Sequence, residues 1–243
     1  MSTFDDVLRR ALSADPGRPL VTFYDLGSGE RVELSVTTYA NWVAKTASLL
    51  VEEHGLDAGD RVRVDLPPHW LTPVFWGAAW SAGLVVTDTA EPDRLDAVVC
   101  GPGALGTWAP LARQVPVLAC SLRPLGVRFA EALPPEVHDV GVEVWGQPDA
   151  FSAPEPPGAA SPAVATAEGL TTHGELWAAA AAGGLLEDGG RLLVHAGATA
   201  SLASAHLTEP LVRGGSLVLV VGDDPDAVRA TGDAERVTAR ARV

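Results

Sequence analysis

The chain has 243 residues, of which 47% are hydrophobic, so it can bury a substantial core and is not an intrinsically disordered protein. Its formal net charge of −14 argues against binding to nucleic acid or to an anionic membrane surface, because both require a basic protein surface. The N-terminus is polar and acidic and the apolar runs are short, so we expect no signal peptide, no membrane insertion and a cytoplasmic location.

The first part of the chain predicts a helix followed by a β-hairpin. Residues 4–12 have a helical pattern, and residues 20–25 have the composition of a strand. The Gly-Ser-Gly run at 27–29 is a turn that leads into a second strand at 31–34.

The segment 34–86 has the sharpest pattern in the chain. Ser35 precedes a helical pattern and can cap its free backbone N–H groups, and Gly55 can end that helix in the left-handed conformation. Apolar and polar residues alternate over 61–66, which is typical of a strand with one buried face. A second helix is expected over 70–82, with a strand after it, so the segment predicts a βαβ unit and a parallel sheet.

Several short motifs in this segment resemble one known superfamily. They are Leu34-Ser35, Gly59-Asp60-Arg61-Val62, Leu66-Pro67-Pro68 and Ala82-Gly83-Leu84-Val85. In this order and spacing they resemble the N-terminal segment of the adenylate-forming enzymes, which include acyl-CoA synthetases, luciferases and peptide-synthetase adenylation domains. The resemblance implies a common ancestry, but in that superfamily this segment is scaffold and carries no catalytic group.

A glycine pattern follows the strand expected over residues 95–100. Gly101, Gly103 and Gly106 form a Gly-x-Gly-x-x-Gly sequence, which in a dinucleotide-binding turn lets the backbone approach a pyrophosphate. The other interpretation is a glycine-rich turn between a strand and a helix. The acidic residue that would bind a ribose about 20 residues further on is missing, which favours the second interpretation.

The middle of the chain is rich in loops. A short strand is expected over 115–119, a proline-punctuated loop over 121–135 and a further strand over 139–145. Residues 147–163 are rich in Pro and Ala and have little pattern, which indicates a linker or a mobile loop.

The remainder, residues 164–243, predicts a second α/β lobe. Thr172 and Glu175 have the spacing of a capping box at the start of a helix. The elements expected after it are a strand at 191–195, a helix at 200–212, a strand at 216–221 and a polar tail at 223–243 with one helix at 226–230. We therefore predict an α/β fold with mainly parallel, layered sheets and flanking helices, arranged as lobes 1–146 and 164–243 around the segment 147–163.

This second lobe again resembles the adenylate-forming enzymes. Residues 169–176, Gly-Leu-Thr-Thr-His-Gly-Glu-Leu, resemble the segment that follows the phosphate loop of the superfamily, and residues 209–220 resemble its later helix, turn and strand. The resemblance makes Thr171, Thr172 and His173 candidate nucleotide-binding residues.

The phosphate loop itself has no counterpart. In the superfamily it is a run of Ser, Thr and Gly that closes on Pro-Lys-Gly, whose N–H groups, hydroxyls and lysine hold the phosphates of ATP. The corresponding residues 161–169 lack its glycines before the last position, lack a lysine and contain the acidic Glu168. Lys45, the one lysine of the chain, lies in the first helical pattern instead.

The resemblance implies a truncated relative. Members of the superfamily continue for several hundred residues with further motifs and a mobile domain that holds a catalytic lysine, so no catalytic residue is carried over to this chain. The chain resembles a small actinobacterial family with distant similarity to AMP-binding enzymes, and its lack of isoleucine fits a genome of high GC content.

Other kinds of site have little support in the sequence. The six histidines form none of the spacings typical of a metal site, no Gly-x-Ser-x-Gly nucleophile motif is present, and the two cysteines suggest buried free thiols or, as the alternative, a disulfide. The aromatic residues of the second helix indicate core packing or, as the alternative, an apolar ligand pocket or partner surface; they are Trp70, Phe75, Trp76 and Trp80.

The sequence therefore predicts a non-catalytic adenylate-forming homologue, without a cofactor or a metal, that binds an unknown protein partner or a small apolar ligand. The alternative is an AMP-forming ligase of the acyl-CoA synthetase type with altered phosphate recognition, which would bind ATP or AMP and would need a second chain. A third hypothesis is a nucleotide-binding protein that uses Gly101, Gly103 and Gly106.

Overall fold

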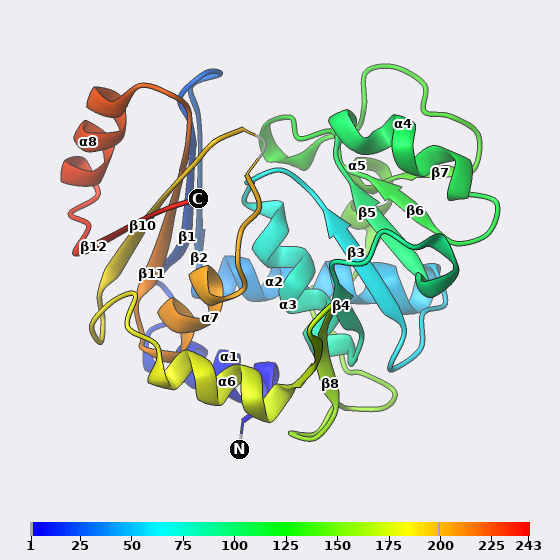
Figure 1. Ribbon diagram of the computed structural model, residues 1–243, viewed down its shortest axis with the longest axis horizontal. Coiled ribbons are helices and arrows are strands. Elements are labelled where there is room, and N and C mark those ends of the chain that lie inside the picture. The colour runs from blue at the N-terminus through cyan, green and yellow to red at the C-terminus, as the bar shows by residue number, and fades with distance from the viewer. Residues whose placement is uncertain (1, 199) are drawn as a thin grey trace. The chain divides into compact units, whose positions relative to one another are not determined.

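The computed structural model describes residues 2–198 and 200–243, and its strands form two sheets (Figure 1). Its helices are α1 (Phe4–Ala14), α2 (Val36–Ser48), α3 (Leu71–Ala82), α4 (Leu105–Trp108), α5 (Val140–Glu143), α6 (His173–Ala182), α7 (Ala205–Val212) and α8 (Pro225–Ala234). Its strands are β1 (Pro19–Asp25), β2 (Glu30–Ser35), β3 (Arg61–Asp65), β4 (Val85–Thr87), β5 (Ala97–Cys100), β6 (Val117–Ala119), β7 (Val137–Asp139), β8 (Pro162–Thr166), β9 (Gly169–Thr172), β10 (Arg191–Ala196), β11 (Ser216–Val221) and β12 (Ala239–Arg242).

The chain divides into two compact units, and each contains one of the sheets. Unit 1 consists of the chain up to Ala40, of Pro67–Pro73 and of the chain from Glu175 onwards. Unit 2 consists of Asn41–Leu66 and Val74–Gly174.

Unit 1 contains a sheet of five strands in the order β12-β10-β11-β1-β2. The first four strands are parallel, and β2 joins β1 through the antiparallel hairpin that the sequence predicts. Val21 of β1 lies opposite Leu217 of β11. The start and the end of the chain therefore belong to one unit. The predicted division into the successive lobes 1–146 and 164–243 differs from this arrangement.

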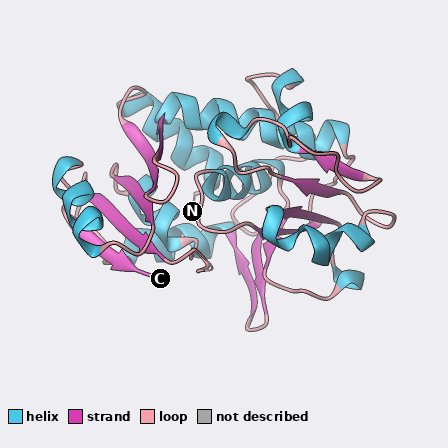
Figure 2. Cartoon of the chain, turned by 90° about the horizontal axis from the view of Figure 1, so that it is seen from above, coloured by secondary structure: helices cyan, strands magenta, loops and turns pink. Residues whose placement is uncertain are grey.

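Unit 2 contains a sheet of seven strands in the order β7-β6-β5-β3-β4-β8-β9, all parallel except β9. Helices lie on both sides of its strands (Figure 2). On one side Trp108 and Leu111 pack against β5 and β6, and on the other Trp80 of α3 donates a hydrogen bond to the carbonyl of Ala163 over 3.1 Å. Residues 147–163 lie wholly inside this unit. They lead into β8, whose Val164 pairs with Val86 of β4 in the same sheet.

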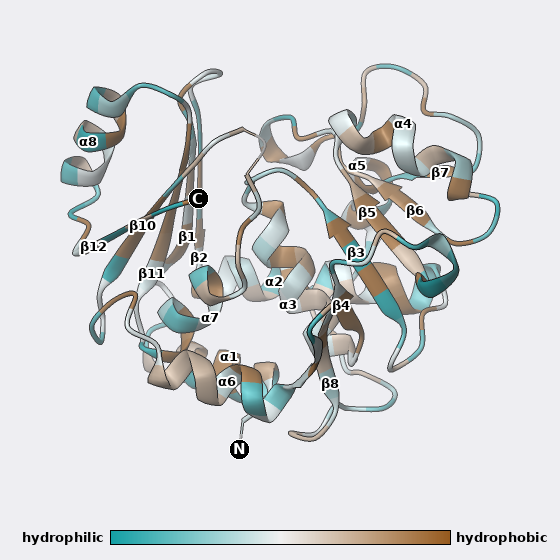
Figure 3. Ribbon diagram, in the orientation of Figure 1, coloured by the Kyte–Doolittle hydropathy of each residue, from teal (hydrophilic) through white to brown (hydrophobic). Residues whose placement is uncertain are grey.

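The core is formed by apolar strands and by the apolar faces of the helices that cover them, and several central strands, such as β5 and β11, are largely brown in Figure 3. All residues of β5 and β6 are buried, as are all but the last residue of β11. Such continuous apolar runs are typical of parallel strands that are covered on both faces. The predicted α/β fold with mainly parallel sheets and flanking helices is confirmed.

Local signals in the sequence predicted the first long helix well. The hydroxyl of Ser35 accepts a hydrogen bond from the N–H of Thr38 over 3.1 Å, directly before α2. The helix continues as a π-helical turn at Leu49–Glu53, and Gly55 follows with a φ of 66°. Both predicted ends of the helix are therefore confirmed.

Three expected elements needed correction. The strand expected over 139–145 is wrong, because the carboxylate of Asp139 accepts a hydrogen bond from the N–H of Gly141 and starts α5 there. The helix expected over 200–212 begins only at Ala205. The polar tail contains, besides its helix, the strand β12, which pairs with β10.

Several single residues lie where the sequence places them. Cys100 and Cys120 are buried free thiols, and burial raises the pKa of Cys100 to about 12. Among the described residues no helix has both the length and the apolar composition needed to cross a bilayer. The aromatic residues of the predicted helix 70–82 are core residues with at most 7% of their surface exposed. Phe75, Trp76 and Trp80 lie on α3, and Trp70 directly precedes it.

Candidate functional site

The segment that corresponds to the phosphate loop is a tight β-hairpin in unit 2. Strands β8 and β9 are antiparallel, and Thr166 pairs directly with Gly169. Only Ala167 and Glu168 lie between them, and the N–H of Glu168 donates to the hydroxyl of Thr166 over 3.2 Å. Gly169 has a φ of 140°, which favours glycine, and it closes this two-residue turn.

A groove of about 460 Å³ lies beside this hairpin. It is lined by residues at the carboxyl ends of β4 and β8, including Thr89 and Thr166, and by the charged residues Arg61, Arg94, Asp88 and Glu91. Arg94 forms an ion pair with Glu91 at 3.2 Å. The two arginines therefore face two carboxylates, and the groove has no excess of positive charge for a polyphosphate.

The three candidate nucleotide-binding residues, Thr171, Thr172 and His173, differ in how deeply they are buried. Thr171 and Thr172 are half-buried on β9, opposite Val164 and Pro162 of β8. His173 begins α6 and is fully buried, and its ring nitrogens have no hydrogen-bond partner among the described residues. Burial lowers the pKa of His173 to about 4, so its imidazole is neutral at pH 7.

The glycine pattern follows the carboxyl end of β5. Gly101 has a φ of −91°, and Gly103 and Gly106 also have no positive φ. A Cβ atom at position 103 or 106 would meet no other atom within 4 Å. None of the three positions needs a positive φ, and no close approach requires glycine at 103 or 106, which agrees with an ordinary turn from a strand to a short helix.

A second and larger groove, of about 790 Å³, lies at the carboxyl ends of β6 and β7. Its apolar lining includes Phe129 and Leu133, and its charged lining residues are Arg123, Arg128, Glu131 and Asp139. In open parallel sheets, ligands bind at the carboxyl ends of the strands, so the position of this groove is typical of a ligand site. Most of its lining residues come from the loop 121–135, whose composition predicted only a loop, and Val137, Asp139 and Val142 come from β7 and α5.

A third feature, which the sequence analysis did not predict, is a cluster of His54, His138 and Glu143 in unit 2. Nε2 of His54 lies 3.0 Å from Oε2 of Glu143, and Nδ1 of His138 lies 3.0 Å from Oε1 of the same carboxylate. The two imidazole rings pack edge to face with centroids 4.4 Å apart. The pKa of His54 is lowered, mainly by burial and to a smaller extent by the neighbouring His138. The spacing rules miss this cluster because 89 positions separate His54 from Glu143.

The sequence of the chain was compared with family models and with the sequences of known proteins. No family model matches the chain. Over 248 residues the chain is 35% identical to a protein of Mycobacterium tuberculosis described as a TIGR03089 family protein, and the alignment covers 96% of this chain and 95% of that protein.

Solved structures of ligases also resemble the chain. An acyl-CoA synthetase of Brucella canis matches with a TM-score of 0.73 and 15% identity over 100% of this chain and 52% of that chain. A benzoate CoA ligase of Burkholderia xenovorans matches with a TM-score of 0.71 and 15% identity over 99% and 50% of the two chains. A fatty acyl CoA synthetase of Mycobacterium tuberculosis matches with a TM-score of 0.68 and 17% identity over 97% and 48%.

The chain thus spans about half the length of these ligases, and at such identities the likeness shows the fold. The fold implied by the resemblance to the adenylate-forming superfamily is confirmed. The chain belongs to the TIGR03089 family, and it has the fold of the N-terminal core of adenylate-forming enzymes.

Proposed function

We propose that this protein uses the adenylate-forming fold without adenylate chemistry and acts by binding a small ligand or a protein partner. The observation that carries the proposal is the turn between β8 and β9, where two residues connect Thr166 directly to Gly169. A loop that surrounds a polyphosphate needs several backbone N–H groups that converge on the anion, and a two-residue turn cannot supply them.

The charges around this turn support the same conclusion. Phosphate sites place a lysine, an arginine or a metal ion against the anion. Here the turn carries Glu168, and the adjoining groove sets Asp88 and Glu91 against its two arginines. A triphosphate at this place would meet carboxylates without a compensating excess of cations.

We assign ligand binding to the groove at β6 and β7. It combines apolar side chains such as Phe129 with the guanidinium groups of Arg123 and Arg128, which form no hydrogen bond or ion pair with other described residues. Its lining also contains the carboxylates of Glu131 and Asp139, but Asp139 already accepts hydrogen bonds from backbone N–H groups. A small amphipathic ligand with an anionic group fits this combination, because the apolar part would leave water while the arginines hold the charge.

The test is carboxylate-dependent exchange of pyrophosphate into ATP, measured with the full chain and a panel of aliphatic and aromatic carboxylic acids. We expect no exchange above the rate without enzyme, in a preparation whose circular dichroism and thermal melt show a folded protein. An authentic acyl-CoA synthetase assayed in parallel provides the positive control. Exchange that depends on one of the acids and saturates with ATP would overturn the proposal.

A second candidate function is a ligase that is completed by another chain. The observation that favours it is the match of the whole fold to CoA ligases of about twice the length. This candidate predicts that exchange appears when a separate chain that supplies the missing half of such a ligase is added, and that the isolated chain already binds ATP.

A further inference from the structure

We infer that His54, His138 and Glu143 form a binding site for a divalent transition-metal ion, for which Zn²⁺ is the test ion. One nitrogen of each imidazole and one oxygen of the carboxylate lie within 4.8 Å of one another. The inference does not depend on the proposed function, because all three residues lie in unit 2 outside the β8–β9 hairpin and its groove.

The donor set is one that zinc prefers. Zinc binds histidine nitrogen and carboxylate oxygen, and sites with two histidines and one glutamate leave a fourth position open to water or a ligand. The side chain of His54 is 4% exposed, whereas those of His138 and Glu143 are 38% and 26% exposed. An ion would therefore be held from the protein side by His54 and could reach solvent on the side of the other two.

The distances also suit a tetrahedral ion. Metal bonds of about 2.0–2.2 Å in a tetrahedron separate neighbouring ligand atoms by roughly 3.3–3.5 Å. The imidazole nitrogens each lie 3.0 Å from Glu143 but from different oxygens, Oε2 for His54 and Oε1 for His138. Because all three donor atoms lie within 4.8 Å of one another, rotation of the carboxylate and the imidazole rings would bring them to these separations around one ion.

The backbone holds two of the three residues in place by local structure. Glu143 ends α5, whose start is fixed by Asp139, since its carboxylate accepts hydrogen bonds from the N–H groups of Gly141 and Phe129 at 3.0 and 2.9 Å. A Cβ atom at position 141 would lie 2.4 Å from the backbone nitrogen of Arg128, so glycine is required for this close packing.

His54 directly follows the π-helical turn at Leu49–Glu53, and its N–H donates to the carbonyl of Leu49 over 3.2 Å. Single π-helical turns are rare and are frequently found at functional sites. His138 lies on the edge strand β7, opposite Leu118 of β6. Three separate elements thus present their donors to one point.

The test is a calorimetric titration of the full chain with Zn²⁺ after removal of metals with a chelator. We expect one equivalent of Zn²⁺ to bind per chain, and we expect Co²⁺ at the same stoichiometry to show the visible absorption of a four-coordinate nitrogen and oxygen site. Replacing Glu143→Gln or His138→Gln should weaken zinc binding by roughly tenfold or more.

The matched control is Glu53→Gln, which removes an exposed carboxylate directly beside His54 that contributes no atom to the cluster. Its zinc affinity should stay within about threefold of the wild type, as expected for a screened charge at the surface. His138→Gln changes a half-buried residue of an edge strand, so it keeps the test valid if Glu143→Gln does not fold.

Two results would overturn the inference. The first is a wild-type chain that shows no saturable zinc binding at micromolar concentrations. The second is equal zinc affinity in the wild type and in both variants, which would assign the binding to other histidines. In either case the cluster would only link β7 and α5 to the end of the first long helix by hydrogen bonds.

Discussion

His69 and His173 are both buried, at 4% and 0% exposure. Burial lowers the pKa of His69 to about 3, although the nearby carboxylate of Asp25 opposes the shift, and burial lowers that of His173 to about 4. In the unfolded chain both imidazoles regain a pKa of about 6.5. The unfolded state therefore takes up protons in a range of pH where the folded state does not.

This difference predicts a loss of stability in mild acid. Stability is fully present above pH 6.5 and falls as the pH drops towards the lower folded pKa values, because protonation favours the unfolded chain. Each histidine should contribute a loss of about 2 kcal/mol in the free energy of unfolding between pH 7.5 and pH 5. Urea unfolding of the wild type and of His69→Asn and His173→Asn at both pH values measures it.

In each variant the free energy of unfolding should fall less between pH 7.5 and pH 5 than in the wild type, by the contribution of the histidine that was replaced. At pH 8 the imidazoles are neutral in both states, so the difference between variant and wild type there gives the packing cost alone. A decline with pH that is the same in the wild type and in both variants would show that these histidines are not its cause.

What a residue does locally was more predictable than where it lies. The cap at Ser35 and the left-handed Gly55 depend on neighbours a few positions away, and both were predicted. The burial of His173 depends on side chains that meet only in the folded unit, so its sequence context gave a resemblance to a binding residue and no sign of full burial.

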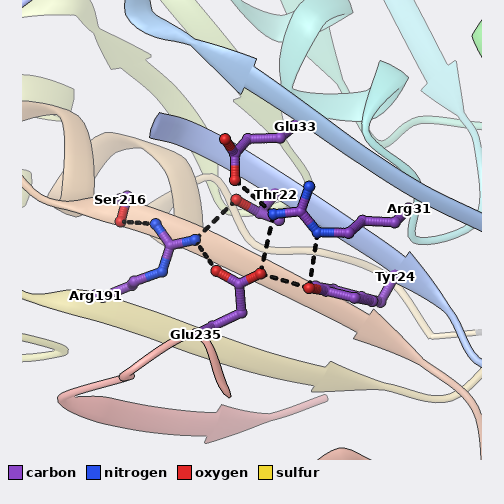
Figure 4. Close-up of polar contacts among 7 residues, drawn as sticks. All are labelled: Thr22, Tyr24, Arg31, Glu33, Arg191, Ser216 and Glu235. Atoms are coloured by element: carbon purple, nitrogen blue, oxygen red, sulfur yellow. Dashed lines mark hydrogen bonds and ion pairs between the residues drawn. The ribbon is translucent and has the colours of Figure 1, made fainter. Parts of the chain in front are cut away.

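At the scale of elements, a polar network ties α8 to the sheet of unit 1 (Figure 4). Glu235, at the end of α8, accepts hydrogen bonds from Tyr24, Arg31 and Arg191. Burial alone would raise the pKa of Glu235, but these hydrogen bonds outweigh it and lower the pKa. Arg191 also donates to the hydroxyls of Thr22 and Ser216, each over 3.0 Å.

Removing the centre of this network should destabilise the protein. The side chains of Glu235 and Arg191 are only 12% and 15% exposed, so Glu235→Ala leaves the guanidinium without its carboxylate in a poorly solvated place. We expect a loss of about 2–3 kcal/mol in the free energy of unfolding, measured by urea denaturation at pH 7.

The control for this prediction is Asp233→Asn, two positions earlier. Asp233 pairs with Arg240 at 3.4 Å, but their side chains are 74% and 45% exposed, so the change should cost no more than about 0.5 kcal/mol. Similar losses in both variants would contradict a special role for the buried network.

The wrong predictions of secondary structure have physical explanations. The run 139–145 has the composition of a strand, but the cap at Asp139 turns it into a helix. Strand β12 (Ala239–Arg242) was missed because its outward residues are arginines, as an edge strand permits, and only its pairing with β10 defines it. Such pairing joins residues that are far apart in the chain.

At the scale of the whole molecule, the class of fold could be predicted because apolar strands alternate with helices along the chain. The membership of the two units could not, because the pairing of β1 with β11 unites segments from the two ends of the chain. The cluster of His54, His138 and Glu143 could not be predicted for the same reason, since the fold alone brings its residues together.

A calorimetric titration of the full chain with Mg-ATP, followed by AMP and an acyl-adenylate analogue, tests most directly whether this fold has kept its nucleotide site. The two-residue turn at Ala167 and Glu168 predicts no detectable heat of binding even at millimolar ATP. Saturable binding at micromolar ATP would contradict the proposed loss of the nucleotide site and would favour the alternative function of an AMP-forming ligase.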